Sequence, residues 1–400
     1  MNPRLDLLQP YPFERLRQLL AGATPPSALK PIRLYIGEPQ HPTPSFIREA
    51  VVANLDGLSL YPTTAGIDAL RQTIADWLIA RYELKQLDAA KQVLPVNGSR
   101  EALFAFAQAV VDGSRPNARV ACPNPFYQIY EGAALLAGAQ PVFLNQTPEN
   151  GFGLALDTLS DAEWATVQLL FVCSPGNPTG RVLSLDEWRE LFALADRHGF
   201  VIAADECYSE IYLDEANPPL GALQAAQALG RTDYKQLVVF SSLSKRSNVP
   251  GLRSGFVAGD AEVLKRFLLY RTYHGCAMSQ TVQMASIAAW RDETHVRDNR
   301  ALYRQKFEQL LPVLSPVLGV AMPDAGFYFW ARTPEDDREF TRALFNETHV
   351  TVLPGQFLSR ETARGNPGAG FVRIALVAGA DECLEAAQRI AGFARQRYGR

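Results

Sequence analysis

Short apolar runs that end in polar side chains alternate with helical patterns between Gln92 and about Gly259. This alternation is typical of an α/β sheet with helices on both faces. In such sheets the carboxyl ends of the parallel strands meet at one edge, where ligands bind. The run from Leu237 to Phe240 leads into the segment SSLSK, which ends at Lys245. The pattern therefore predicts that Lys245 lies at the ligand-binding edge.

Phosphate-binding side chains flank this lysine in the sequence SSLSKRSNVPGLRSG. The hydroxyls of Ser242 and Ser244 and the forked guanidinium of Arg253 match the geometry of a phosphate. Pyridoxal 5'-phosphate (PLP) forms a Schiff base with a lysine only when its phosphate is anchored close to the amine. We therefore predict that Lys245 binds PLP covalently. The alternative is a surface turn rich in Ser, Lys and Arg.

Three other apolar runs also end in polar residues. These are Asn177 after the run 167–173, Asp205 and Tyr208 after 200–204, and Gly98, Ser99 and Arg100 after 92–96. With these residues in this order, the sequence resembles the class I and II aminotransferases of fold type I over nearly its whole length. The resemblance implies a large α/β domain, with a mostly parallel mixed sheet between helices, and a smaller α+β domain.

The resemblance also implies how the cofactor is held. Family positions that match Lys245 and Asp205 hold its aldehyde and its ring nitrogen, and those that match Asn177 and Tyr208 bind its ring hydroxyl. An ionised carboxylate keeps the ring protonated, as an electron sink requires. Structural interpretations remain for both polar residues: Asp205 as a cap after a strand, and Asn177 in NPTG as a turn former.

Two further elements are expected around the cofactor. Ser99 and the backbone N–H groups of Gly98 to Arg100 start a predicted helix over 101–111, and a helix N-terminus binds anions. Tyr127, in PNPFYQIY, matches the aromatic residue that stacks on the ring in this family. The structural alternatives are an ordinary helix start for NGSR and an apolar cluster for Tyr127 and Tyr130; for Tyr130 we favour the cluster.

Substrate contacts are expected at three positions. Arg373 lies within the apolar run FVRIAL, and a buried arginine there needs an anionic partner such as the substrate α-carboxylate. The alternative is an edge strand that points Arg373 toward water. Gly37, in IGEP, resembles the glycine whose backbone lies near the substrate in this family, and Asn177 is expected to contact the substrate as well as the cofactor.

Tyr61, in YPTTAG, resembles the tyrosine that this family donates to the cofactor phosphate of the neighbouring subunit. This implies a homodimer with shared sites; a core aromatic is the alternative. The proline-rich start of the chain suits an irregular arm better than a helix. We expect residues 1–45 to form this arm and part of the small domain, 46–290 the large PLP-binding domain, and 291–400 the C-terminal small domain.

Composition excludes several other classes. Lys and Arg number 39 against 42 acidic residues, so no basic field for nucleic acid is expected. No apolar stretch approaches the roughly 18 residues of a membrane span, and we expect a cytoplasmic protein. The five cysteines and five histidines lack ligand spacing, which predicts neither a disulfide framework nor a metal site.

Within the α/β region, Ser184 and Glu187 predict a capped helix that runs to His198 and stops at Gly199.

Longer stretches resemble the N-succinyl-LL-diaminopimelate aminotransferase group of this family, namely SLSKRSNVPGLRSGF, YRTYHGCAMS and NPRLDLLQPYPFERLRQLL. The resemblance implies amino transfer between N-succinyl-LL-2,6-diaminopimelate and 2-oxoglutarate, with glutamate as donor in lysine biosynthesis. Arg373 would bind the α-carboxylate of both substrates, and groups near Arg271 and His274 are expected to edge the pocket.

Three alternatives stay open. The chain could be an aminotransferase for aspartate, alanine or an aromatic amino acid, or an enzyme of another PLP reaction such as β-elimination or decarboxylation. A PLP-binding regulator would carry a DNA-binding module, for which the sequence has neither the extra length nor a basic patch.

Overall fold

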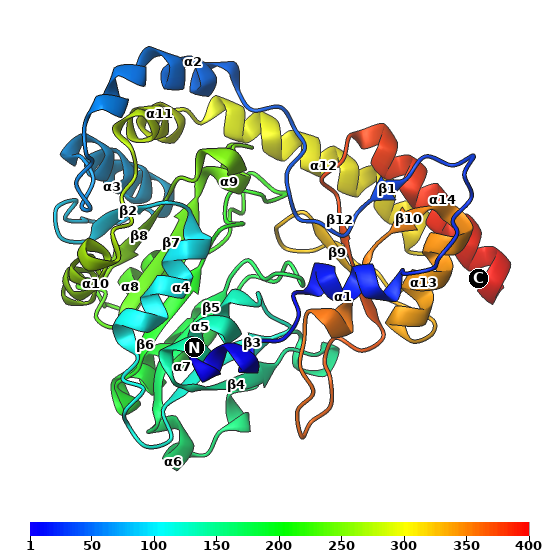
Figure 1. Ribbon diagram of the computed structural model, residues 1–400, viewed down its shortest axis with the longest axis horizontal. Helices are drawn as coiled ribbons and strands as arrows, with labels where there is room; N and C mark the ends of the chain where they lie inside the picture. The colour runs from blue at the N-terminus through cyan, green and yellow to red at the C-terminus, as the bar shows by residue number, and fades with distance from the viewer. Residues whose placement is uncertain (400) are drawn as a thin grey trace.

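A seven-stranded sheet, in the order β2-β8-β7-β6-β5-β3-β4, dominates the computed structural model, which describes residues 1–399 (Figure 1). Its strands are β2 (Val93–Val96), β3 (Arg119–Asn124), β4 (Gln140–Asn145), β5 (Val167–Cys173), β6 (Val201–Asp205), β7 (Leu237–Ser242) and β8 (Gly255–Gly259). Only β8 runs against its neighbours, so the other strands share one carboxyl edge. This mostly parallel mixed sheet confirms the predicted fold class.

Helices cover both faces of this sheet. One face packs on α4 (Ser99–Val110), α5 (Ile129–Ala137) and α10 (Ala261–His274), and the other on α2 (Ser45–Ala53), α3 (Asp68–Tyr82), α7 (Leu185–His198), α8 (Ala222–Ala228) and α11 (Gln280–Arg291). Alternate residues of β7 enter the two cores: Val238 and Phe240 one, Leu237 and Val239 the other. Because both faces are filled, a ligand has to bind at the strand ends, and in sheets of this kind it binds at the carboxyl ends.

A smaller body is built around three antiparallel strands, in the order β11-β12-β9. These are β9 (Tyr328–Arg332), β11 (Leu353–Pro354) and β12 (Phe371–Ala375), packed with α12 (Thr294–Leu314), α13 (Asp337–Thr348) and α14 (Ala380–Tyr398). The early strand β1 (Ile32–Arg33) joins this body by parallel pairing with β10 (Val350–Thr351). In Figure 1, the long helix α12 runs from the large sheet region into this body.

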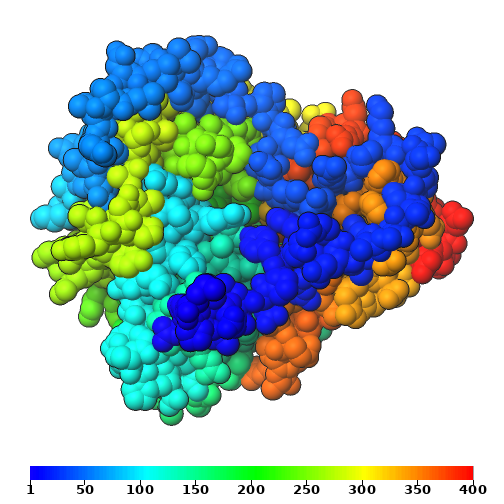
Figure 2. Space-filling view, viewed as in Figure 1, coloured from blue at the N-terminus to red at the C-terminus, as the bar shows by residue number. Residues whose placement is uncertain are grey.

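The expectation of an irregular N-terminal arm is wrong for residues 12–19, which form the helix α1 (Pro12–Leu19). Pro12 occupies the first helical turn, where no backbone N–H is required and a φ near −65° suits the helix. Leu16 then packs into a small apolar cluster with Trp330 and Phe357. Figure 2 shows the N-terminal segment, in dark blue, crossing the face of the molecule toward the C-terminal body.

Short helices complete the described chain: η1 (Pro3–Leu7), η2 (Leu55–Ser59), η3 (Pro148–Asn150), η4 (Leu156–Thr158), α6 (Asp161–Trp164), α9 (Leu243–Arg246), η5 (Pro250–Leu252) and η6 (Gly355–Phe357). The capping box before α7 is confirmed: the Ser184 hydroxyl accepts from the Glu187 N–H at 3.3 Å, and Glu187 accepts from the Ser184 N–H at 2.9 Å. Gly199 ends this helix at a φ of 80°.

Within residues 1–399, no helix combines the length and the apolar character that a membrane crossing requires. In the same part of the chain, histidine, cysteine and acidic side chains form no group of three or more that could bind a metal ion.

Glu206 follows β6 directly and is buried. Its Oε1 accepts from the Ala222 N–H at 2.6 Å, and its Oε2 accepts from the Tyr82 hydroxyl at 3.3 Å. Burial disfavours the charged form more than these two donors favour it, and it raises the pKa of Glu206 from 4.5 to about 7. The folded protein therefore binds this proton more tightly than the unfolded chain does.

This difference predicts a pH-dependent stability. The contribution of Glu206 is fully present below its unfolded pKa and is lost as the pH rises through about 7. Glu206→Gln keeps a neutral side chain of the same shape, so at pH 8 it should increase the free energy of unfolding by up to ~3 kcal/mol. Most of this gain should disappear at pH 5. Urea denaturation at both pH values measures it, and an equal effect at both would contradict the expectation.

Candidate active site

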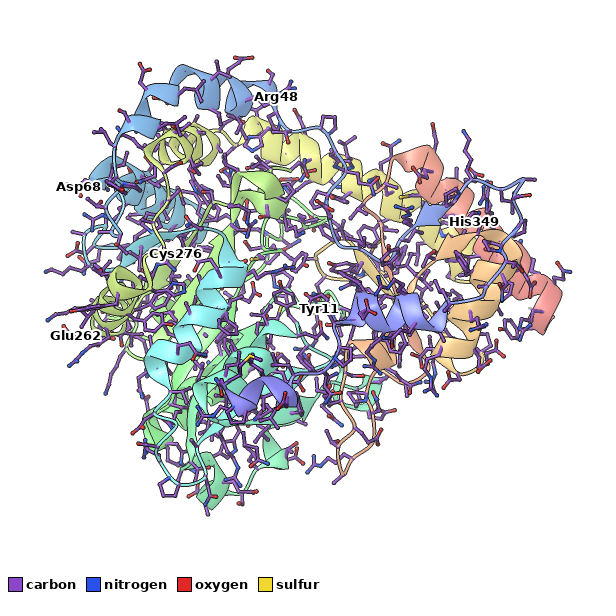
Figure 3. All side chains as sticks on the ribbon, in the orientation of Figure 1. Tyr11, Arg48, Asp68, Glu262, Cys276 and His349 are labelled. Atoms are coloured by element: carbon purple, nitrogen blue, oxygen red, sulfur yellow. The ribbon has the colours of Figure 1, made fainter. Side chains whose placement is uncertain are left out.

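A cavity of about 650 Å³ opens at the carboxyl edge of the large sheet, between this edge, the start of α1 and the small body. Most residues singled out in the sequence line it: Gly37, Ser99, Arg100, Tyr127, Asn177, Asp205, Tyr208, Ser242, Ser244, Lys245, Arg253 and Arg373. Figure 3 labels Tyr11, which also lines the cavity and lies just before α1. The cavity thus combines residues from both ends of the chain.

Lys245 projects into this cavity from the short helix α9. The Ser242 hydroxyl caps the helix by accepting from the Ser244 N–H at 3.3 Å. The Lys245 amine donates to the carbonyl oxygen of Gly37. Burial, helped by the charges of Arg373 and Arg100, lowers the pKa of Lys245 to about 8. Roughly a tenth of the amine is therefore uncharged at pH 7, far more than for a solvated lysine, and the uncharged form is the nucleophile.

Asp205 ends β6 at the floor of the cavity. Its Oδ2 accepts from the Tyr130 hydroxyl at 2.7 Å, and its Oδ1 accepts from the Cys207 N–H at 3.2 Å. Burial raises the pKa of Asp205, whereas the donors from Cys207 and Tyr130 act in the opposite direction. The carboxylate is thus supplied with hydrogen bonds, forms no ion pair with another residue of 1–399, and can attract a protonated ring nitrogen.

Tyr130 combines two roles, of which sequence reasoning found one. Its ring does join the apolar cluster, stacked on Phe171 with centroids 4.7 Å apart. Its hydroxyl, however, bonds to Asp205, and this contact was missed. The local sequence does not signal this contact, because a tyrosine near the start of a helix looks the same whether it only packs in the core or also donates to a carboxylate.

Arg373 lies in β12, the central strand of the small sheet, and is only 4% exposed. The alternative of an edge arginine that points to water is therefore wrong. Its guanidinium donates to Asn177 Oδ1 at 2.9 Å and to the Tyr35 carbonyl at 2.8 Å, and it lies over the Tyr328 ring. Among residues 1–399 its Nε has no partner and no carboxylate neutralises it. Such a buried charge binds an anion favourably.

Tyr328 is a lining residue that the sequence did not reveal. Its hydroxyl lies 2.9 Å from that of Tyr208, which fixes both phenols at the cavity wall. Gly37 permits this arrangement because a Cβ at that position would collide with the Tyr328 hydroxyl. The position of Tyr328 depends on how the small sheet packs against the large one, and local sequence patterns do not encode this packing.

A second group of residues has the chemistry of a phosphate site. Ser99 begins α4, and the preceding Gly98 has a φ of 85° and no room for a Cβ beside the Arg253 guanidinium. The Ser242 and Ser244 hydroxyls line the same cavity. Helix N-terminal N–H groups, hydroxyls and a guanidinium together suit a dianion. Cys207, which donates to the Ser99 hydroxyl at 3.0 Å, was not anticipated here.

Four expected residues do not line the cavity of this chain: Tyr61, Arg271, His274 and Gly98, the last of which lies beside the Arg253 guanidinium. Tyr61 is 104% exposed in the loop after η2. Arg271 is fully buried and pairs with Glu101 at 2.8 Å, and His274 is exposed at the end of α10. The expectation that Arg271 and His274 edge the pocket does not hold within one chain, because Arg271 is needed to neutralise Glu101.

A sheet edge that presents a buried lysine, a carboxylate and a phosphate-type cradle around one cavity defines a fold type I PLP-dependent transferase. Residues 30–390 match the family described as "Aminotransferase class I and II", and the chain belongs to this family. Its cofactor is PLP. The cavity fits this group, because it offers donors for a phosphate, a carboxylate for a ring nitrogen and an amine for an aldehyde.

Known proteins resemble the chain over almost all of its length. An aminotransferase structure from Neisseria meningitidis is 54% identical, with a TM-score of 0.95 and coverage of 98% of this chain and 99% of that one. LL-diaminopimelate aminotransferase from Maridesulfovibrio salexigens is 33% identical over 393 residues, which are 97% of each chain. A probable N-succinyldiaminopimelate aminotransferase from Thermus thermophilus is 27% identical, with a TM-score of 0.81 and coverage of 91% and 95%.

The buried amine generates a prediction about titration. In cofactor-free protein, Lys245 should titrate near pH 8, whereas a solvated lysine titrates near 10.4. Acetylation by dilute acetic anhydride reports the pKa of Lys245, because only the uncharged amine reacts. The rate is followed by mass spectrometry of the Lys245 peptide from roughly pH 6 to pH 11, a range that brackets both pKa values. Lys265, exposed on α10, serves as the surface reference in the same sample. A Lys245 profile that coincides with that of Lys265 would show the prediction to be wrong.

Proposed function

We propose that this aminotransferase moves the amino group between N-succinyl-LL-2,6-diaminopimelate and 2-oxoglutarate, with glutamate as the amino donor in the biosynthetic direction. The observation that carries a transaminase role is the single cavity that combines the amine of Lys245, the carboxylate of Asp205 and the unneutralised guanidinium of Arg373. These three groups suit the aldehyde and ring of the cofactor and the α-carboxylate of an amino acid.

We assign the proton transfer to Lys245. PLP supplies an electron sink that acidifies the substrate Cα–H. The Lys245 amine first holds the cofactor. After its release, the amine is placed to take the proton from the substrate Cα and to deliver it to C4′ of the cofactor. A pKa near 8 suits this role, because a general base works best when its pKa lies near the operating pH.

The other cofactor contacts are assigned from the resemblance to the family and from the residues that line the cavity. Asp205 holds the ring nitrogen, Asn177 and Tyr208 bind the ring hydroxyl, and Tyr127 stacks on the ring. The phosphate is assigned to the hydroxyls of Ser99, Ser242 and Ser244, the backbone of Gly98 to Arg100, and the guanidinium of Arg253. Both groups of residues converge on one cavity, which supports the assignment.

The substrate α-carboxylate is assigned to Arg373, with Asn177 and the backbone of Gly37 beside it. For the distal end we propose Arg100, which was expected to contribute only its backbone. Its Nε donates to the Tyr127 hydroxyl at 2.6 Å, and within residues 1–399 no carboxylate pairs with its guanidinium. A guanidinium free to bind a second carboxylate favours substrates with an acidic distal group.

Two substrate identities compete because named relatives point to both. The Thermus thermophilus relative is named for the N-succinyl compound, and the Maridesulfovibrio salexigens relative is named for LL-diaminopimelate itself. The two compounds differ in distal charge: the free compound carries a distal ammonium, which needs an anionic partner, whereas succinylation replaces this ammonium with an amide and a carboxylate. The Arg100 guanidinium can bind the carboxylate that succinylation adds, and it therefore favours the succinylated compound. The exposed Glu38 at the cavity can bind the distal ammonium, and it therefore favours free LL-diaminopimelate.

The choice of donor gives a direct test. Glutamate and N-succinyl-LL-diaminopimelate should both convert the bound aldehyde to pyridoxamine phosphate, which is followed by absorbance, and aspartate should do so poorly. Aspartate is shorter by one methylene, which typically costs about 1–3 kcal/mol in discrimination. Arg100→Met should lower kcat/KM for both good donors. A higher kcat/KM for free LL-diaminopimelate than for the succinylated compound would promote the alternative, and aspartate as the best donor would overturn both.

We further propose that the chain forms a homodimer in which Tyr61 reaches the cofactor phosphate of the partner. Exposed apolar side chains lie close to it in the sequence: Val52 on α2, Leu55 and Leu58 on η2, and Leu60 directly after η2. Exposed apolar side chains in such number are typical of a protein interface. A tyrosine that lies outside its own cavity, close to such side chains in the sequence, is well placed to enter a neighbour's site.

Mixed dimers test this arrangement. In a heterodimer of Lys245→Ala and Tyr61→Ala subunits, a crossing Tyr61 puts both lesions in one site and leaves the other intact, so about half of the wild-type activity should return. Lys245→Ala combined with Arg253→Ala should restore nothing, because Arg253 lines its own chain's cavity. Separately tagged subunits allow the heterodimers to be purified and assayed. Failure of the Tyr61 pair to recover activity, or a monomer by light scattering, would contradict the proposal.

A further inference from the structure

We infer that Tyr130 is a positioning residue that controls where the proton lies between Asp205 and the ring nitrogen of the cofactor. Its hydroxyl weakens the carboxylate as a base and thereby leaves the proton on the ring. The inference rests on the assignment of Asp205 to the ring nitrogen under Proposed function, but on no particular substrate.

The contact is short, buried and rigidly supported. Tyr130 is 0% exposed, and its ring stacks on Phe171 at an interplanar angle of 12°. Its hydroxyl lies 2.7 Å from Asp205 Oδ2, while Asp205 Oδ1 takes the Cys207 backbone N–H. The Cys207 side chain also favours the charged form of Asp205, so Tyr130 is one of two side-chain partners of this carboxylate. Tyr130 is the partner with the short hydroxyl contact, and its hydroxyl can be removed without changing the loop after β6.

The direction of this hydrogen bond is fixed by the proton affinity of the phenol. Burial, together with the neighbouring Asp205 charge, raises the pKa of Tyr130 well above its ordinary value of 10. The hydroxyl therefore stays protonated at every working pH and donates to the carboxylate. It neither takes up nor releases a proton during the reaction, which distinguishes a positioning residue from a general acid or base.

The consequence lies in the competition between two bases. Burial raises the pKa of Asp205 and so favours its neutral form, and the hydrogen bond from Tyr130 is one of the contacts that oppose this shift. A proton shared between Asp205 and a ring nitrogen rests mainly on the stronger base. Removal of the Tyr130 donor strengthens the carboxylate as a base, so the proton moves from the ring toward Asp205. A neutral ring is a weaker electron sink.

The same helical turn couples this donor to Tyr127. The Tyr130 N–H donates to the Tyr127 carbonyl at 3.0 Å, and the two rings meet edge to face with centroids 5.8 Å apart. The residue assigned to the ring face and the residue that donates to the ring-nitrogen carboxylate are therefore in direct contact.

Tyr130→Phe tests the inference because it keeps the stacked ring and removes only the hydroxyl. With PLP labelled with nitrogen-15 in the ring, the nitrogen resonance of the variant should move toward the value of an unprotonated pyridine at the same pH. For the best amino donor, kcat should fall about 10-fold with KM nearly unchanged, as expected for a lost hydrogen bond to a charged group. The primary isotope effect with Cα-deuterated donor should rise. An unchanged nitrogen resonance would overturn the inference.

Two comparisons make the result specific. Tyr234→Phe removes a hydroxyl from another buried tyrosine, one that bonds to the Gln86 carbonyl at 3.3 Å outside the cavity lining, and it should leave the resonance in place. Replacement of Tyr130 by 3-fluorotyrosine keeps the side chain and makes the phenol a stronger donor, so the resonance should move in the opposite direction. This second variant decides the question if Tyr130→Phe does not fold, and a shift in the same direction as Tyr130→Phe would overturn the inference.

Asp205→Asn distinguishes a failure of this inference from a failure of the assignment of Asp205 to the ring nitrogen. If Asp205→Asn moves the ring-nitrogen resonance and Tyr130→Phe does not, the inference about Tyr130 fails and the role of Asp205 stands. If Asp205→Asn itself has no effect on the resonance, the assignment of Asp205 fails, and the inference fails with it.

Discussion

The site depends on one buried positive charge, that of Arg373, which no carboxylate among residues 1–399 neutralises. Arg373 extends from the central strand of the small sheet, yet its hydrogen bonds go to Asn177 beyond β5 and to the Tyr35 carbonyl in the N-terminal segment. A buried guanidinium with only neutral acceptors is costly until an anion arrives. Arg373 thus connects three distant parts of the chain, and its positive charge can attract an anion at the point where they meet. It also helps to lower the pKa of Lys245, so the anion site and the amine are electrostatically linked.

The large-sheet half of the site could be predicted because its geometry follows from strand order alone. Apolar runs buried on both faces end at one edge, and Asn177, Asp205 and Lys245 each follow such a run. Their meeting needs no knowledge of side-chain packing. The capped helix α7 was likewise predictable, because its start and stop signals are local.

The rest could not be predicted because it depends on contacts between segments far apart in the sequence. Tyr328 reaches Tyr208 only because the small sheet packs against the large one, and Tyr11 reaches the cavity only because α1 crosses over it. Local signals were also misread: a proline at a helix start resembles a helix breaker, and Arg271 resembles a ligand until its partner Glu101 is seen. Tyr130 shows a further limit, since a core residue and a polar partner of a carboxylate look alike in sequence.

The pairing of β1 with β10 has a consequence for how the protein is made. Ile32 and Arg33 leave the ribosome early, but their strand partners Val350 and Thr351 emerge only when synthesis is nearly finished. Until then the segment that carries Gly37 has no sheet to join, whereas the large sheet, closed between residues 93 and 259, can already fold. During synthesis, the residues assigned to the phosphate can therefore take their places before Gly37 and Arg373, which are assigned to the substrate carboxylate.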